Sequence, residues 1–239
     1  MWNKEAQKWR RRVLSSASRG GNSKPSHKSV LPLDFESIIK SDGDTKNCCE
    51  RNAAKRLIPS IAQQYPKRNF IIVEDALAAN DSHIKLLCEH NTDFVIGVKA
   101  TGSCPLFADF DERRGNAVGQ IVELESTDEN NVRRGYRFGN DLAINKSHPD
   151  VRVNLMEFWE TNAKGVEREW SWITSLPITR ENAAQIAAIE RSRWGIENQT
   201  FNTLKNQGYD LEHNYGHRKK YLSNTLAGLM LLAFLIDQV

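Results

Sequence analysis

Two adjacent carboxylates, Glu74 and Asp75, follow three branched apolar residues in the stretch IIVEDALAAN, residues 71–80. The apolar residues predict a short buried strand, inside which an unpaired carboxylate would be costly. Asp75, at the end of such a strand, would be partly solvated and could bind a divalent metal ion, because Mg²⁺ prefers oxygen ligands. Alternatively, Glu74 or Asp75 caps the next helix, a common place for Asp. This stretch alone favours the cap.

A second group of charged residues that could take part in chemistry lies in ERSRWGIENQTFNTLK, residues 190–205. Arg193 and Glu197 are four residues apart and would lie on one face of a helix, with Lys205 rotated by roughly a further 80°. Arg191 is a weaker candidate for the same basic surface. The alternative is an ordinary amphipathic helix with a surface ion pair, which contributes little stability. The spacing alone does not reject it.

The elements that must position these residues alternate between strands and helices. This alternation predicts a layered α/β domain with parallel strand pairing. The ligand side of such a sheet lies at the carboxyl ends of its strands, where Asp75 falls. The expected strands are 29–39, 70–75 and 93–100, and the expected helices are 41–66, 80–91, 179–208 and 218–236.

The period of the sequence changes after TGSCP, residues 101–105. Alternating apolar and polar residues predict four further strands, and turn residues between them predict antiparallel pairing. We therefore expect an antiparallel β insertion at 107–171 within an α/β domain formed by 30–106 and 172–239. The expected strands are 117–125, 132–139, 151–160 and 168–176.

The charge is distributed unevenly along the chain. Residues 1–30 contain eight Lys or Arg and one Glu, whereas the other 209 residues contain 25 Lys or Arg and 29 Asp or Glu. Residues 1–29 therefore read as a basic disordered tail, although a short basic helix, a phosphate-binding arm or a transit peptide fit the composition too. The body is not a generic basic DNA-binding domain, so any basic surface on it must be local.

The apolar runs and the cysteines of the sequence bear on the cellular compartment of the protein. The longest apolar run, residues 226–236, is shorter than the roughly 20 residues of a membrane helix, so we expect a buried helix. The four cysteines show no CxxC spacing. They suit a reducing cytoplasm and argue against structural zinc.

The motifs VEDALAAN, WITSLPIT and RSRWGIENQTFNTLK, in this order around a β-rich section, resemble the catalytic domain of bacterial insertion-sequence transposases of the DDE type. The resemblance runs from Val30 to the C-terminus and implies a ribonuclease-H-like fold with a β insertion. It matches Asp75 to the second Asp of the acidic triad and Glu197 to the terminal Glu. Arg193 and Lys205 match the basic members of a Tyr-Arg-Glu-Lys signature. The chain departs from that signature at Glu190, where Tyr is usual, and Lys205 lies one residue further from Glu197 than usual.

The resemblance also implies a chemistry. Two Mg²⁺ or Mn²⁺ ions held by the triad would support DNA strand cleavage and joining in transposition. Arg193 and Lys205, with Arg191 as the weaker candidate, would bind phosphates of the transposon ends. Related enzymes act as dimers, so a homodimer or an intact transposase relative is the expected protein partner. We expect a bacterial cytoplasmic, nucleoid-associated protein that does not bind membranes.

One departure is an absence. The first Asp of the family lies on the first strand of its sheet, upstream of a strand that resembles residues 29–39, but residues 1–29 contain no Asp. We therefore expect a domain that lacks its first strands, an N-terminally truncated transposase that is inactive alone.

Two functions of other classes stay open. A non-catalytic DNA-binding or interaction protein derived from a transposase would use the basic tail and would not need Asp75. A zinc protein could use His213 and His217, four residues apart, with Glu212 or a cysteine. His83 and His90 are expected on the surface of a helix.

Overall fold

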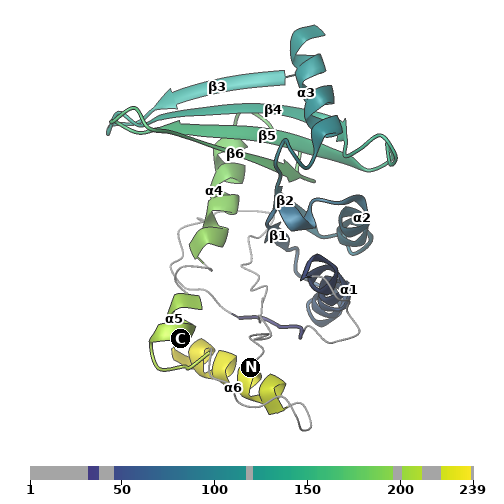
Figure 1. Ribbon diagram of the computed structural model, residues 1–239, viewed down its shortest axis with the longest axis vertical. Coiled ribbons are helices and arrows are strands. Elements are labelled where there is room, and N and C mark those ends of the chain that lie inside the picture. The colour runs from purple at the N-terminus through teal and green to yellow at the C-terminus, as the bar shows by residue number, and fades with distance from the viewer. Residues whose placement is uncertain (1–31, 38–45, 117–120, 196–200, 212–221, 238–239) are drawn as a thin grey trace, which may run out of the picture. The chain divides into compact units, whose positions relative to one another are not determined.

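The computed structural model describes residues 32–37, 46–116, 121–195, 201–211 and 222–237 (Figure 1). Contacts divide these residues into two compact units. The sheet unit is residues 67–194, and the helical unit comprises the described parts of 26–66 and 195–239. The predicted tail, 1–29, lies outside the described residues.

The sheet unit is built on one six-stranded sheet with the strand order β1-β2-β6-β5-β4-β3. β1 and β2 pair in parallel, and every other neighbouring pair is antiparallel. Because β6 pairs with both β2 and β5, the predicted insertion strands continue the sheet that carries Asp75. The strands are β1 (Ile71–Glu74), β2 (Asp93–Gly97), β3 (Ile121–Thr127), β4 (Arg133–Ala143), β5 (Arg152–Thr161) and β6 (Glu167–Thr174).

Helices cover both faces of this sheet (Figure 1). α4 (Ala183–Gly195) packs on the face that we call the α4 face, where its buried residues meet large side chains of the strands. α3 (Cys104–Asn116) lies on the other face, since a Cβ at Gly139 would lie 3.3 Å from the Phe110 ring. The core of the α4 face includes Ile71, Val95, Phe138, Met156, Phe158, Trp172, Ile186, Ala187 and Ile189.

The side chains at the end of β1 point alternately to the two faces of the sheet. Ile71 and Val73 pack into the core of the α4 face. Their neighbours Ile72 and Glu74 point to the opposite face, because successive side chains of a strand alternate. That opposite face is covered by α2 (Asp81–Glu89), which is joined to β1 by the short 3-10 helix η2 (Ala76–Ala78).

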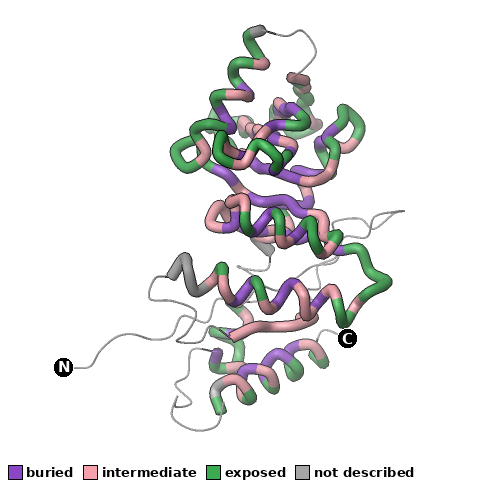
Figure 2. Tube along the Cα trace, turned by 90° about the vertical axis from the view of Figure 1, so that its right-hand side faces the viewer, coloured by how far each residue is buried: buried purple, intermediate pink, exposed green. Residues whose placement is uncertain are grey.

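The helical unit contains α1 (Lys46–Gln64), α5 (Asn202–Asn206) and α6 (Leu222–Asp237). α6 buries Met230, Leu231 and Phe234 in a core with Leu204, Leu211 and Phe35. Buried and exposed residues alternate within the turns of α6 (Figure 2), and Leu229 and Ile236 are 56% and 66% exposed. The expectation of a buried helix at 226–236 is therefore right for one face of α6 and wrong for the other. None of the described helices is long and apolar enough to cross a membrane.

Most expected elements of the sheet unit are confirmed, including the parallel β1–β2 pair and the four later strands. The mixed α/β class is confirmed. The expected boundary between residues 171 and 172 falls inside the unbroken strand β6, and the expected insertion begins with part of α3. The division into catalytic domain and insertion stays a prediction.

One local prediction is wrong and one is described only in part. The expected strand at 29–39 is not formed in its described part, where residues 32–37 have no regular secondary structure. Asp34 instead accepts hydrogen bonds from Ser60 and Gln64 of α1, and Glu36 binds Arg56. Of the expected helix 179–208, the structure describes α4 and α5, and residues 196–200 between them lie outside the described residues, so its continuity stays a prediction.

Candidate active site at the end of strand β1

Asp75 is the first residue beyond β1 and is half-buried. Its backbone is extended (φ −78°, ψ 176°), and its Oδ1 accepts a hydrogen bond from the Leu77 backbone N–H at 3.0 Å. The predicted helix cap therefore exists, on η2. Capping does not exclude metal binding, because a carboxylate has about four lone-pair sites on its two oxygens. Continuing the alternation of Ile71 and Val73 places Asp75 toward the α4 face.

Glu74 is the more deeply buried member of the carboxylate pair, with 4% of its surface exposed. Its Oε2 lies at hydrogen-bonding distance from Nε2 of His83, which is 5% exposed. The core strand therefore tolerates Glu74 because a helix of the opposite face supplies a partner. The expectation that His83 lies on the surface is wrong. The spacing of His83, Ile84 and Leu87, which share one helical face, was the available signal.

Gly97, at the end of β2, lies beside Asp75. A Cβ at Gly97 would be 3.5 Å from the Ala76 backbone N and 3.8 Å from the Asp75 Cα. Gly97 shares its face with Val95, so this missing side chain leaves space on the α4 face next to Asp75. The carboxyl ends of the two parallel strands thus meet at one edge, where ligands of α/β sheets bind.

The core-facing side of α4 changes from apolar to charged toward its C-terminal end. Ala183, Ile186 and Ala187 are buried, and Glu190 continues their spacing with 8% exposure. The Arg193 Nε lies 3.3 Å from the Glu190 Oε1. Glu190, the departure from the signature, therefore holds Arg193 within α4. Both belong to the sheet unit, as does Asp75.

Arg191 is held by the sheet. Its Nη1 lies 3.1 Å from the Glu160 Oε2 of β5, and the same carboxylate oxygen binds the Arg134 Nε at 3.0 Å. Partial burial would raise the pKa of Glu160, but the hydrogen bonds from Arg134 and Arg191 outweigh it and hold that pKa below its usual value. The Arg191 side chain is half exposed. Its ion pair anchors the helix to the sheet.

The other predicted site residues fall elsewhere. Lys205 lies exposed in the last turn of α5, in the helical unit. Glu197 lies outside the described residues, as do Glu212, His213 and His217 of the zinc alternative. Of the five predicted site residues, the sheet unit therefore contains Asp75, Arg191 and Arg193.

The donor chemistry of Asp75 fits a divalent metal ion. It is a carboxylate, it is half-buried at the end of a strand, and it lies beside the side-chain-free Gly97. Within the described part of the chain, no three His, Cys, Asp or Glu residues are grouped to hold a metal. Among the described residues, Asp75 could therefore be one ligand of a metal ion, and the described residues contain no whole set.

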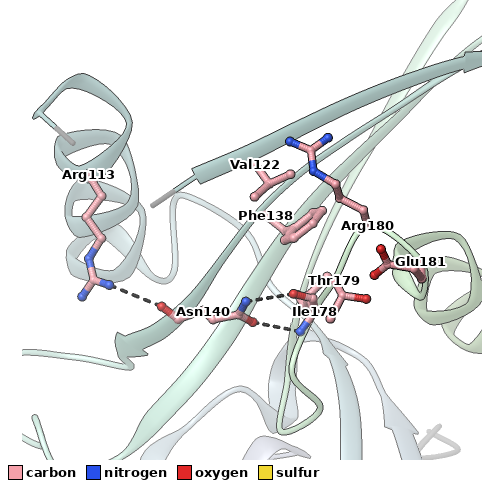
Figure 3. A pocket seen from close by; sticks show the side chains of 8 residues that line it. All are labelled: Arg113, Val122, Phe138, Asn140, Ile178, Thr179, Arg180 and Glu181. Atoms are coloured by element: carbon pink, nitrogen blue, oxygen red, sulfur yellow. Dashed lines mark hydrogen bonds between the residues drawn. The ribbon is translucent and has the colours of Figure 1, made fainter. Parts of the chain in front are cut away.

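A pocket of about 560 Å³ lies where the loop before α4 meets β4 (Figure 3). The Asn140 amide bonds both the backbone N and O of Ile178 at 2.9 Å, which holds this loop against β4. Arg113 at the rim is bound to Asp109 and to the Asn140 carbonyl. No predicted site residue lines the pocket, whose basic side chains include Arg113, already engaged by Asp109.

The comparison with known families gives the protein its class. No curated protein matches the sequence. The family described as "Transposase DDE domain" matches residues 3–235. This match begins well before Val30 and spans the sheet unit and almost all of the helical unit. The chain belongs to the transposase DDE domain family.

Proposed function

We propose that this protein takes part in DNA transposition by metal-dependent phosphoryl transfer, with Asp75 and Glu197 as metal ligands. The observation that carries the proposal is the position of Asp75. It is a half-buried carboxylate directly after the carboxyl end of a parallel strand, and strand alternation turns it toward the face covered by α4, which bears Arg193. Membership of the transposase family supports the assignment to transposition.

We assign metal binding and phosphate binding to different residues of the chain. Asp75, oriented by the Leu77 N–H, would hold a divalent ion together with Glu197. Arg193 and Lys205 would bind DNA phosphates, Arg193 through its planar guanidinium and Lys205 as a point charge. Arg191 would contribute less, because it is bound to Glu160. When bound, two divalent ions would activate the attacking hydroxyl and stabilise the leaving oxygen.

We further propose a ribonuclease-H-like layering in which β1 would pair with one more strand. Among the described residues β1 pairs with β2 alone, so its other edge is where a strand bearing a further carboxylate would fit. With two of three carboxylates the chain alone would cleave poorly, because metal geometry controls in-line transfer. Its partners would be transposon ends and a second copy or an intact relative, at the bacterial nucleoid.

Binding of Mn²⁺ to the purified chain tests the metal site. Asp75→Asn and Glu197→Gln should each weaken Mn²⁺ binding by at least about tenfold, since even outer-shell changes cost about that much. Glu157→Gln is the matched control, because Glu157 is a carboxylate of the same sheet unit bound to Arg137. Unchanged Mn²⁺ affinity in both site variants would overturn the assignment.

Nicking of supercoiled DNA tests the second part of the proposal. The chain alone should nick at background rate in Mg²⁺ or Mn²⁺. Fast nicking that both Asp75→Asn and Glu197→Gln abolish would establish a complete site in this chain, and would refute the proposed deficiency while supporting the ligands.

A further inference from the structure

Two buried polar side chains have no part in the proposed chemistry. Glu74 and His83 are 4% and 5% exposed and bind each other across the face of the sheet opposite to the α4 face. Burying such a pair is costly, and well-packed apolar residues often serve stability equally well. Glu74 is nevertheless the residue immediately before Asp75, so whatever fixes Glu74 fixes the backbone that carries Asp75.

The segment between the two residues is closed by its own hydrogen bonds. Asp75 accepts from the Leu77 N–H through Oδ1 at 3.0 Å and from the Ala78 N–H through its carbonyl at 3.1 Å. Asn80 then caps α2 by accepting from the His83 N–H at 3.1 Å. His83 returns to Glu74, nine residues earlier, through its ring. Residues 74–83 therefore form a loop that is closed by hydrogen bonds, and Asp75 is part of this loop.

We infer that Glu74 and His83 are positioning residues that hold the end of β1, and with it the Asp75 carboxylate, in the orientation that binds metal. The role in metal binding rests on the proposed function. Strand alternation turns Glu74 and Asp75 to opposite faces, so the pair acts through the backbone and not as a ligand. An apolar pair would fill the same space without the directional bond, so it would not fix the hydrogen-bonded loop 74–83 to the same degree.

Amide hydrogen exchange of Leu77 in the ¹⁵N-labelled full chain, without metal, tests the positioning. Glu74→Leu and His83→Phe should raise the exchange rate of the Leu77 N–H by at least about tenfold, because the bond to Asp75 would open more often. The control is Leu87→Ala, which removes a fully buried side chain of the same helix. It lowers stability and keeps both partners of the Glu74–His83 bond. A Leu77 rate no higher in the pair variants than in Leu87→Ala would overturn the inference.

Mn²⁺ titration of the same samples tests the link to metal, through paramagnetic broadening of the Leu77 amide signal. The midpoint should rise by about tenfold in Glu74→Leu and His83→Phe, as for other residues that orient a ligand, and should not change in Leu87→Ala. Wild-type midpoints in the pair variants would refute the link. If the wild-type chain shows no Asp75-dependent broadening, the proposed function fails, while the exchange rates still decide the positioning.

Discussion

The basic residues of the outer strands β3–β5 and those of residues 191–205 can be compared by their surroundings. On the outer strands each of several arginines binds carboxylates. Arg137 lies between Glu123 and Glu157 at 2.6 and 2.9 Å, and Arg134 binds Asp128 and Glu160 at 2.9 and 3.0 Å. Two further pairs are Arg133 with Glu125 and Arg152 with Asp141.

The basic side chains of residues 191–205 differ among themselves, because Arg191 binds Glu160 and Arg193 binds Glu190. Lys205, in contrast, lies exposed in the last turn of α5. Phosphate binding depends on net local charge, and carboxylates beside an arginine would repel a phosphate. The comparison teaches that the number of arginines does not identify a DNA-binding surface. The arginines of the outer strands read as part of the scaffold.

The largest expected effect concerns that scaffold. The Trp159 ring covers Gly135, so that a Cβ at Gly135 would lie 1.9 Å from the ring, and Arg137 stacks on the same ring at 5.2 Å. Gly135→Ala should therefore lower the free energy of unfolding by about 1–3 kcal/mol, as for other overpacked sites. Urea unfolding measures this loss.

A matched substitution serves as the control. A Cβ at Gly115, in α3, meets nothing within 4 Å, so Gly115→Ala should leave stability unchanged or raise it by about 0.5–1 kcal/mol. Equal stability of the two variants would contradict the expectation that the packing of Trp159 on Gly135 stabilises the outer strands.

The next effect separates the two groups of basic residues directly. Lys205→Gln should weaken binding to duplex DNA of any sequence and reduce the salt dependence, log K against log[salt], by about 1. Arg137→Gln should leave this slope unchanged, because its guanidinium is already bound to two carboxylates. Binding at several salt concentrations gives both slopes. An equal loss of slope in Arg137→Gln would remove the distinction between scaffold and DNA-binding basic residues.

The strands of the sheet were predictable from two patterns. β1 and β2 are short continuous apolar runs, buried on both faces, whereas the later strands alternate between apolar and polar residues. The same alternation failed at residues 32–37. Phe35 packs into the core of the helical unit, while Asp34 and Glu36 bind side chains of α1. Alternation of apolar and polar residues shows only that a segment has one apolar and one polar side. An extended segment that packs on a helix has two such sides without pairing to another strand.

The candidate site was predictable only in part. Asp75 could be singled out because it ends an apolar run, and the mixed α/β alternation places such ends at one edge. The Glu74–His83 bond was missed because it joins a strand to a helix of the opposite face, a contact that neither element's own periodicity contains. The buried Glu190 was missed for a related reason, since a charged residue on an apolar stripe gives no sign of its partner.

The smallest effect that sharpens the comparison is the pH dependence of the Glu160 pair. Because Arg134 and Arg191 lower the pKa of Glu160 in the folded protein, the unfolded state binds its proton at higher pH than the folded state does. The pair therefore stabilises fully above the unfolded pKa of about 4.3, and this contribution is lost as the pH falls through the lower folded pKa. Glu160→Gln should cost up to about 1 kcal/mol at pH 7, the range of exposed ion pairs, and the difference from wild type should vanish in acid. Urea unfolding of both proteins between pH 7 and pH 3 measures it, and a difference that persists in acid would show that Glu160 stabilises by packing rather than by charge.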